Sequence, residues 1–286
     1  MTGSATTLGF ALDAIIARAL DEDLAAGDVT TLATVDPNTV ATARAIAKTP
    51  LVACGGEVFH RVFHKIDTSL QVEASVTEGQ RVTAGQVLWT VRGKAQSILM
   101  AERTALNFVQ RLCGIATLTR QFVDALPKNS RTRITDTRKT TPGLRLLERY
   151  AVRVGGGHNH RDNLGSAVLI KDNHIAAAGS IPAAVKAAQA TAPHTSKIEV
   201  EVTNFTQLDE ALRAGAQIVM LDNFDDGQVA RALTTVAGRA LVEISGGMTL
   251  ERIAALGKLD VDIISVGALT HSARAADISL ELSLQR

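Results

Sequence analysis

The sequence predicts an incomplete α/β barrel of about six parallel strands, joined to an N-terminal α+β sheet domain. The first observation is that apolar runs of strand length alternate with helical patterns in the second half of the chain, which is typical of a parallel sheet covered by helices. The second is that charged residues or glycines follow these runs directly, as they do at the catalytic end of a barrel. The third is that only six such units are recognisable in 286 residues, too few for the usual eight-stranded barrel.

Residues 1–115 are predicted to form the N-terminal domain, and the C-terminal segment 272–286 is expected to return to it. An amphipathic first helix ends near Gly27, and it is indicated by apolar residues at helical spacing: Leu8, Leu12, Ile15, Ile16, Ala19 and Leu20. Short alternating segments at 39–93 predict a small sheet. A long helical pattern at 97–126, split near Gly114, then leads into the barrel.

Three segments of this sheet resemble the folded-over strands of a lipoyl or biotinyl carrier: 71–74, 78–82 and 85–91. Such carriers are modified on a lysine at a hairpin tip, and no lysine lies at that place here. We therefore interpret the segments as part of a small sheet domain. A non-enzymatic carrier-like module is the alternative, and any enzymatic turnover would exclude it.

Residues 116–271 are predicted to form the catalytic barrel. Its strand-like runs are 132–135, 167–170, 198–202, 218–221, 240–244 and 263–266. Helical patterns separate most of them, at 144–154, 181–192, 206–214, 228–236 and 250–256. Because the active site of an α/β barrel lies at the carboxyl ends of its strands, the residues just after these runs are the first candidates for chemistry.

The composition excludes several classes of function. A net charge of +1 gives no general attraction for nucleic acid or an anionic membrane, and 3% aromatic residues are too few for base-stacking surfaces. No apolar run has the length of a transmembrane helix, and Asp13 interrupts the first apolar stretch, which argues against a signal peptide. We therefore expect a cytoplasmic protein that binds neither nucleic acid nor membrane. Cys54 and Cys113 lack the spacing of a disulfide framework and are expected to be small buried apolar residues.

A cationic cluster lies between Thr137 and Ile175, where seven Lys or Arg residues and three histidines stand against only three Asp or Glu residues. A triple glycine, 155–157, lies within it. Because like charges repel, a plain surface loop gains nothing from this arrangement, and we interpret the cluster as the site of a substrate rich in carboxylate or phosphate. His158 and His160 in the glycine-rich loop are expected to donate hydrogen bonds to an anion rather than to bind zinc.

Arg138, Arg161 and Lys171 are the strongest candidates for binding a carboxylate, since a guanidinium offers a planar pair of donors that matches its two oxygens. The alternative is structural ion pairing with neighbouring carboxylates: Asp136, Asp162 and Asp172.

Two other groups of polar residues are interpreted as structural. Arg145, Glu148 and Arg149 lie at helical spacing, which is typical of a solvent-exposed helix face. His60 and His64 lie four residues apart on a helix, but no third metal ligand is near them in the sequence.

Two strand ends that contain glycine predict a phosphate site. Ser245-Gly246-Gly247-Met248 lies between a strand and a helix, and Val266-Gly267-Ala268 follows the next strand. Glycines let backbone N–H groups approach phosphate oxygens, and the amino end of the following helix attracts an anion.

Glu201 and Asp222 end neighbouring strands. Carboxylates at these places could hold ribose hydroxyls, Mg²⁺ or a developing positive charge. The alternative is that both are buried partners of the cationic cluster.

Short motifs in a fixed order span nearly the whole chain. They are Glu22-Asp23-Leu24 with Gly27-Asp28-Val29-Thr30, Glu102-Arg103-Thr104-Ala105-Leu106-Asn107, Gly114-Ile115-Ala116-Thr117, Thr-Arg-Lys-Thr-x-Pro-Gly, Gly-Gly-Gly-x-Asn-His-Arg, Ile-Lys-Asp-Asn-His, Glu-Val-Glu-Val, Leu-Asp-Asn-Phe and Ser-Gly-Gly. In these motifs the sequence resembles the quinolinate phosphoribosyltransferase family. Cys113 stands where members of that family often have serine, and His158 stands at a variable place.

The resemblance implies a reaction in which quinolinate, a pyridine dicarboxylate, attacks the anomeric carbon of phosphoribosyl pyrophosphate through its ring nitrogen. Pyrophosphate and carbon dioxide leave, and nicotinate mononucleotide is formed for NAD synthesis. The resemblance also implies Mg²⁺, bound through pyrophosphate and ribose with Glu201 and Asp222 nearby, and a homodimer or higher oligomer whose subunits share the active site. A related phosphoribosyltransferase acting on nicotinate or another planar carboxylic acid is the alternative, and it would release no carbon dioxide.

The resemblance further implies which residues form the site. Quinolinate is expected to contact Arg103, Thr137, Arg138, Lys139, His160, Arg161 and Lys171. The phosphoribosyl group is expected to contact Lys139, Lys171, Glu201, Asp222, Ser245, Gly246, Gly247, Val266, Gly267, Ala268 and His271. The expected catalytic residues are Lys139, Lys171, Glu201 and Asp222.

Overall fold

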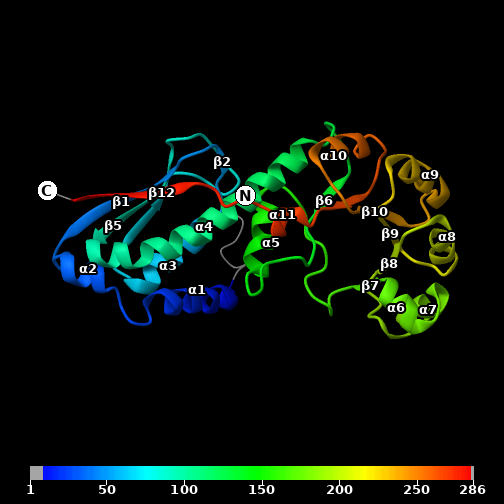
Figure 1. Ribbon diagram of the computed structural model, residues 1–286, viewed down its shortest axis with the longest axis horizontal. Helices are drawn as coiled ribbons and strands as arrows, with labels where there is room; N and C mark the ends of the chain where they lie inside the picture. Colours follow the sequence, from blue (N-terminus) through cyan, green and yellow to red (C-terminus); the bar gives the residue numbers. More distant parts are fainter. Residues whose placement is uncertain (1–8, 285–286) are drawn as a thin grey trace. The chain divides into compact units, whose positions relative to one another are not determined.

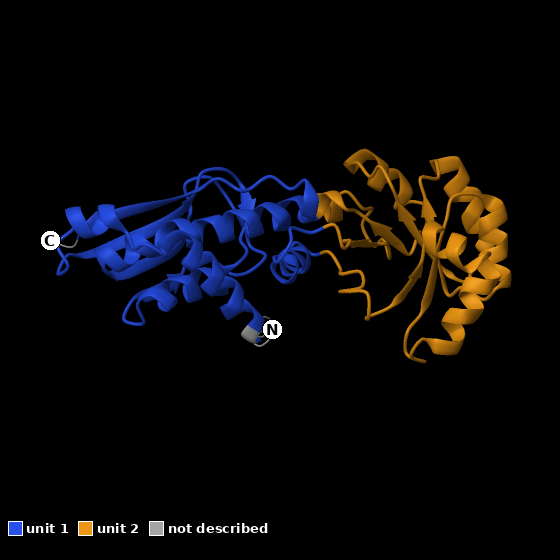
Figure 2. Ribbon diagram, turned by 60° about the horizontal axis from the view of Figure 1, so that its bottom comes forward, with its two compact units in different colours: residues 1–120, 140–156, 270–286 blue, residues 121–139, 157–269 orange. Residues whose placement is uncertain are grey.

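The computed structural model describes residues 9–284, and the chain divides into two compact units (Figure 1, Figure 2). The first unit comprises residues 1–120, 140–156 and 270–286, and the second comprises residues 121–139 and 157–269. Residues 1–8, which include Leu8 of the predicted first helix, and residues 285–286 lie outside the described part. Three separate stretches of the chain thus build the first unit.

The first unit contains a four-stranded antiparallel sheet in the order β12-β1-β5-β3. Its strands are β12 (Ile278–Leu284), β1 (Val40–Ala47), β5 (Val87–Lys94) and β3 (Gln71–Ala74), and β2 (Leu51–Val52) forms a separate pair with β4 (Arg81–Val82). Ala43 of β1 lies opposite Leu282 on one side and Val91 on the other. The last strand of the chain therefore pairs with the first.

The first unit also contains all or part of six helices: α1 (Gly9–Leu24), α2 (Val29–Thr34), α3 (Gly56–Ile66), α4 (Ala95–Asp124), α5 (Arg145–Val154) and α11 (Ala268–His271). Three of the apolar residues that predicted the first helix are buried in α1: Leu12, Ile16 and Leu20. Phe59 of α3 stacks on Trp89 of β5, with 4.9 Å between ring centroids. Asp28 caps α2 by accepting a hydrogen bond from the amide of Thr31.

Helix α4 runs without interruption from Ala95 to Asp124, so the predicted split near Gly114 is wrong. Gly114 is required for close packing instead, because a Cβ atom at this position would lie 2.0 Å from the carbonyl oxygen of Arg274. A glycine inside a helix costs about 1 kcal/mol relative to alanine. The close approach of residues 274–275 offsets that cost, and the helix continues through it.

The predicted exposed face of α5 is also wrong, because Glu148 is fully buried and Arg149 is nearly so. Two groups satisfy the Glu148 carboxylate: the guanidinium of Arg111 on α4, at 2.8 and 3.0 Å, and the hydroxyl and amide of Thr141, at 2.7 and 3.1 Å. Helical spacing shows which residues share a face, but it does not show which partner another element brings to that face.

The second unit contains a six-stranded parallel sheet in the order β6-β11-β10-β9-β8-β7. The strands are β6 (Arg133–Thr135), β7 (Val168–Ile170), β8 (Ile198–Val202), β9 (Ile218–Asp222), β10 (Leu241–Ser245) and β11 (Ile263–Ser265). Helices α6 (Asp172–Ala178), α7 (Ile181–Thr191), α8 (Phe205–Arg213), α9 (Asp226–Val236) and α10 (Leu250–Leu256) alternate with them. The predicted fold class, an incomplete α/β barrel together with an N-terminal antiparallel sheet domain, is confirmed.

The barrel is incomplete because β6 and β7 are the two edges of the sheet. An isolated parallel bridge between Thr135 and His158 brings the segment that precedes β7 alongside β6. This bridge carries the glycine-rich loop to the carboxyl end of the sheet, where the predicted site residues lie.

Two expectations from composition concern this fold. No helix in the described part of the chain combines the length and apolar character needed to cross a lipid bilayer. Cys54 and Cys113 are both fully buried and free, as predicted, and burial raises the pKa of the Cys113 thiol to about 12.

Candidate active site

The strands of the second unit direct polar side chains into one cavity of about 430 Å³, the strand-end cavity. It is lined by Thr137, Arg138, Lys139, His160, Arg161, Leu169, Lys171, Glu201, Met220, Asp222, Glu243, Ser245 and Ser265. All six strands of the parallel sheet contribute, either with their last residues or with the residues that follow them. Parallel strands end at the same edge of a sheet, which is why residues far apart in the sequence share this cavity.

The structure brings together nine of the predicted site residues in this cavity: Thr137, Arg138, Lys139, His160, Arg161, Lys171, Glu201, Asp222 and Ser245. Arg103, which is exposed on α4, and His271 at the end of α11 belong to the first unit and are not among its lining residues. Val266, Gly267 and Ala268 follow β11 but do not line the cavity either. The roles of all these residues stay predictions.

Gly246 and Gly247 line a different hollow, together with residues 223–227 and Arg252. Gly246 has a φ of +96°, and a Cβ atom there would lie 2.1 Å from Oδ1 of Asn223, so only glycine fits this turn. Arg252 donates a hydrogen bond from Nη1 to the carbonyl oxygen of Gly246 at 2.8 Å. The loop after β10 therefore has a fixed shape.

The cavity contains side chains of both charges. Lys171 forms an ion pair with Glu201, and Asp222 accepts a hydrogen bond from Asn223 at 3.0 Å. The Lys171 side chain is 42% exposed and that of Glu201 is 14% exposed. Glu201 is thus a partner of the cationic cluster, as the alternative interpretation holds, while both side chains still line the cavity.

Two guanidinium groups lie close enough in the cavity to affect each other. Burial, and then the neighbouring charge of Arg138, lower the pKa of Arg161. Arg161 also donates a hydrogen bond from Nη1 to the carbonyl oxygen of Ala167 at 3.1 Å. An anion bound between the two guanidinium groups would relieve this repulsion.

Asp136 fixes the loop that carries His160. Its buried carboxylate accepts hydrogen bonds from the His160 amide at 2.8 Å and from Nδ2 of Asn159 at 2.6 Å. The next amide, that of Arg161, donates to Nδ1 of His160 at 2.8 Å. The Asp136 carboxylate and the His160 ring therefore hold the main chain at 160–161.

Nε2 of His160 lies 3.3 Å from a carboxylate oxygen of Glu199 and 3.3 Å from one of Glu243. Both carboxylates are almost fully buried, at 5% and 1% side-chain exposure. Sequence reasoning missed these two acids as site residues. A signal was present, because Glu199 shares a strand face with Glu201, and Glu243 shares one with Ser245.

Comparison with known proteins agrees with this geometry. Residues 28–113 match the N-terminal domain and residues 115–281 the C-terminal domain of quinolinate phosphoribosyl transferase. The chain belongs to the quinolinate phosphoribosyltransferase family. The nicotinate-nucleotide pyrophosphorylase [carboxylating] of Mycobacterium leprae is 46% identical over 273 residues, which cover 93% of this chain and 95% of the relative.

Two further relatives support the same assignment. The probable nicotinate-nucleotide pyrophosphorylase [carboxylating] of Bacillus subtilis is 41% identical over 263 residues, covering 92% of this chain and 90% of the relative. The crystal structure of NadC from Streptococcus pyogenes superimposes with a TM-score of 0.92 at 42% identity, covering 97% of this chain and 98% of that one.

In this quinolinate phosphoribosyltransferase family member, the buried cluster of His160, Glu199 and Glu243 raises the pKa of two of its groups, Glu199 and His160. Burial, and then the adjacent Glu243, raise the pKa of Glu199 to about 7, although the hydrogen bond from His160 lowers it. For His160, burial lowers the pKa, but the hydrogen bonds to both acids outweigh burial and raise it to about 10. The hydrogen bond from the Arg161 amide opposes this, because an imidazolium needs a proton on Nδ1. We therefore expect Glu199 to be the group that titrates near neutral pH.

Because of Glu199, the unfolding free energy is expected to fall as the pH rises from about 4.5 to about 7. Its pKa is raised in the folded state from 4.5 to about 7, so its contribution to stability is full below pH 4.5 and is lost as the pH rises through about 7. The loss is roughly 3 kcal/mol. Glu199→Gln should remove this pH-dependent loss of stability. Urea unfolding of both proteins from pH 4.5 to 8 measures the difference, and parallel pH profiles would contradict the expectation.

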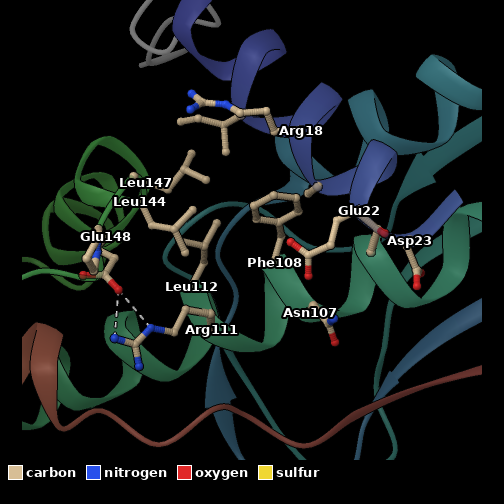
Figure 3. A pocket seen from close by; sticks show the side chains of 15 residues that line it. Arg18, Glu22, Asp23, Asn107, Phe108, Arg111, Leu112, Leu144, Leu147 and Glu148 are labelled. Carbon is tan, nitrogen blue, oxygen red and sulfur yellow. Dashed lines mark hydrogen bonds and ion pairs between the residues drawn. The ribbon is translucent and has the colours of Figure 1, made fainter. Parts of the chain in front are cut away.

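A second cavity of about 430 Å³ lies in the first unit between α1, α4 and the start of α5 (Figure 3). Phe108, Leu112 and Leu147 give it an apolar wall, and Arg18 and Glu22 contribute charged groups. Its remaining arginine, Arg111, is paired with Glu148. The lining residues of this cavity differ from those of the strand-end cavity, and none of the predicted site residues is among them.

Proposed function

We propose that this protein transfers the phosphoribosyl group of phosphoribosyl pyrophosphate to quinolinate with decarboxylation, giving nicotinate mononucleotide, pyrophosphate and carbon dioxide. The observation that carries the proposal is the strand-end cavity of a quinolinate phosphoribosyltransferase family member, in which cations from 138–139, 161 and 171 surround two carboxylates. Family relatives are named for this activity.

Quinolinate carries two adjacent carboxylates, and the cavity offers a matching pair of guanidinium groups, Arg138 and Arg161. Charge-assisted hydrogen bonds to them would orient the pyridine ring, with Thr137 and Lys171 beside it. Orientation matters because the ring nitrogen must point at the anomeric carbon of the second substrate.

Ribosyl transfer passes through a state in which positive charge develops on the sugar. Glu201 and Asp222, at the ends of neighbouring strands β8 and β9, would stabilise that charge, and Lys139 and Lys171 would stabilise the negative phosphates. Glu201 and Asp222 would lie near Mg²⁺ if it binds with the substrate, and the ion would supply positive charge to the leaving pyrophosphate. Mg²⁺ binds oxygen ligands, including carboxylates, so Glu201 and Asp222 are compatible with a nearby Mg²⁺ ion.

Decarboxylation needs no further cofactor. The ring nitrogen becomes cationic when its lone pair forms the bond to the anomeric carbon, and pyrophosphate leaves with the old bonding pair. That cation stabilises the electron pair left on the adjacent ring carbon when carbon dioxide departs, and a proton then takes the place of the lost carboxylate.

We also propose a homodimer in which the exposed Arg103 of one subunit completes the quinolinate site of the other. The support is that Arg103 lies in a family motif yet does not line the cavity of its own second unit. A cytoplasmic location stays a prediction from the sequence.

Purified protein with quinolinate, phosphoribosyl pyrophosphate and Mg²⁺ tests the proposed function. Nicotinate mononucleotide and carbon dioxide should form in equal amounts, and omission of Mg²⁺ should slow the reaction. Nicotinate, which has one carboxylate, is the competing substrate. Turnover of nicotinate in preference to quinolinate, without carbon dioxide, would favour the alternative phosphoribosyltransferase.

Arg138→Ala and Arg161→Ala are each expected to weaken quinolinate by about tenfold or more, because each removes a charge-assisted interaction of roughly 1.5–3 kcal/mol. Arg92→Ala, which loses an exposed arginine paired with Glu73 in the first unit, is the matched control and should bind normally. Titration of quinolinate into each folded variant gives the affinities. Unchanged affinity in both cavity variants would exclude the guanidinium pair as the carboxylate site.

A further inference from the structure

The interior of the barrel contains a charged cluster of His160, Glu199 and Glu243, and two of its members, His160 and Glu243, also line the strand-end cavity. Met220 of β9 pairs with Glu201 of β8 on one side and with Glu243 of β10 on the other, so Glu243 is level with Glu201. Glu199 lies two residues before Glu201 on the same face of β8. His160 reaches both buried acids from the loop between β6 and β7. Barrel interiors are usually filled by bulky apolar side chains, so two acids at these places need a reason.

The hydrogen bonds of His160 fix its tautomer. Nδ1 accepts a hydrogen bond from the Arg161 amide at 2.8 Å, so it carries no proton. The ring proton must then lie on Nε2, which is directed at the carboxylates of Glu199 and Glu243. A metal ion on Nε2 would need the proton on Nδ1, where the Arg161 amide already lies, so this geometry fits a hydrogen-bonded cluster and not a metal site.

Each acid keeps one oxygen without a partner. Oε1 of Glu199 and Oε1 of Glu243 are buried and find no hydrogen-bond partner among the described residues 9–284. Burying such groups is costly for a fold that needs only packing. Residues that break a packing rule at the floor of a binding cavity are expected to serve the site.

We propose that Glu199 and Glu243 are positioning residues: they hold His160 through its Nε2–H and, through the ring, the Arg161 main chain, so that the Arg161 guanidinium faces the substrate carboxylate. The chain of contacts runs from the two acids to Nε2, from Nδ1 to the Arg161 amide, and from Arg161 into the cavity. This proposal rests on the proposed function, because it assigns the substrate bound by Arg161.

Glu243→Leu and Glu199→Leu remove the acceptors while keeping a bulky side chain in the barrel. In folded protein, each should raise the KM for quinolinate by about tenfold or more and change the KM for phosphoribosyl pyrophosphate by less than about twofold, because only the 160–161 segment loses its support. Glu243→Gln keeps an acceptor oxygen and should restore the quinolinate KM to within about threefold of wild type.

Val200→Ala is the matched control, because Val200 is fully buried on the opposite face of β8 and contributes only packing. It should lower the melting temperature without a selective change in the quinolinate KM. A leucine variant that keeps the quinolinate KM within about twofold, or a selective KM effect of equal size in Val200→Ala, would overturn the proposal.

The ¹⁵N spectrum of the histidine rings tests the tautomer in the wild-type protein, and it needs neither turnover nor a folded variant. His160→Gln assigns the resonances, and we expect an unprotonated Nδ1 and a protonated Nε2 for His160. A protonated Nδ1 on a neutral ring, or a metal ion that co-purifies and is lost in Glu243→Gln, would overturn the proposal. Absence of turnover in the wild type would instead overturn the proposed function.

Discussion

Arg103→Ala and Lys171→Ala are each expected to be nearly inactive, and refolding the two variants together is expected to restore roughly a quarter of wild-type activity. Lys171 lines the strand-end cavity and is paired with Glu201, whereas Arg103 is exposed on α4 in the other unit. If a dimer shares its sites, one site of each mixed dimer carries both lesions and the other carries neither. Random pairing makes half of the dimers mixed, and half of their sites are intact.

The experiment needs proof that mixed dimers form, which two different affinity tags on the variants provide. Wild-type protein refolded in the same way corrects for incomplete recovery. Arg92→Ala controls for loss of an exposed arginine from the first unit and should remain fully active. If the purified mixed dimers are inactive, Arg103 and Lys171 act within one chain, and the shared site is wrong.

Glu201→Gln and Asp222→Asn are expected to lower the maximal rate by about 10²-fold while weakening quinolinate much less. Both carboxylates line the cavity at the ends of adjacent strands. Their charge acts mainly when positive charge develops on the ribose, so the loss should fall on kcat more than on binding. Glu201→Gln also frees the Lys171 ammonium from its ion pair, which should make its effect the larger one.

Steady-state kinetics with each substrate varied in turn measures this split. Asp209→Asn, on the exposed surface of α8, removes a carboxylate of the same unit and should leave the kinetics unchanged. Turnover near the wild-type level in both cavity variants would make the carboxylates structural. A loss confined to the apparent Mg²⁺ affinity would instead make them part of the metal site.

Much of the fold could be predicted because its signals are local. Most strands of the second unit are short, largely apolar runs followed by a helix, and parallel strands joined by helices place their carboxyl ends together. That rule alone predicted that Arg138, Lys171, Glu201, Asp222 and Ser245 would share a cavity, and they do. The cations were recognisable because like charges gathered among glycines have no use on a plain surface.

Predictions from local sequence patterns were wrong where a contact from another helix or loop determines the environment of a residue. Gly114 looked like a helix break, but it is the place where Arg274 crosses α4. Glu148 looked exposed from its helical spacing, but Arg111 and Thr141 reach it from two other segments. In both cases the deciding partner is distant in the sequence, and periodicity within one helix carries no information about it.

The sequence by itself therefore determined the order of strands and helices, the edge at which the chemistry lies and the sign of its charge, because these follow from periodicity and residue type. Only the tertiary structure decided how deep each charge lies. His160 reaches Glu199 on β8 and Glu243 on β10 although the register of β9 sets Glu243 level with Glu201 and not with Glu199, and the bridge from Thr135 to His158 brings the loop alongside β6. Register and closure depend on the packing of the whole sheet, so no single segment of the sequence encodes that cluster.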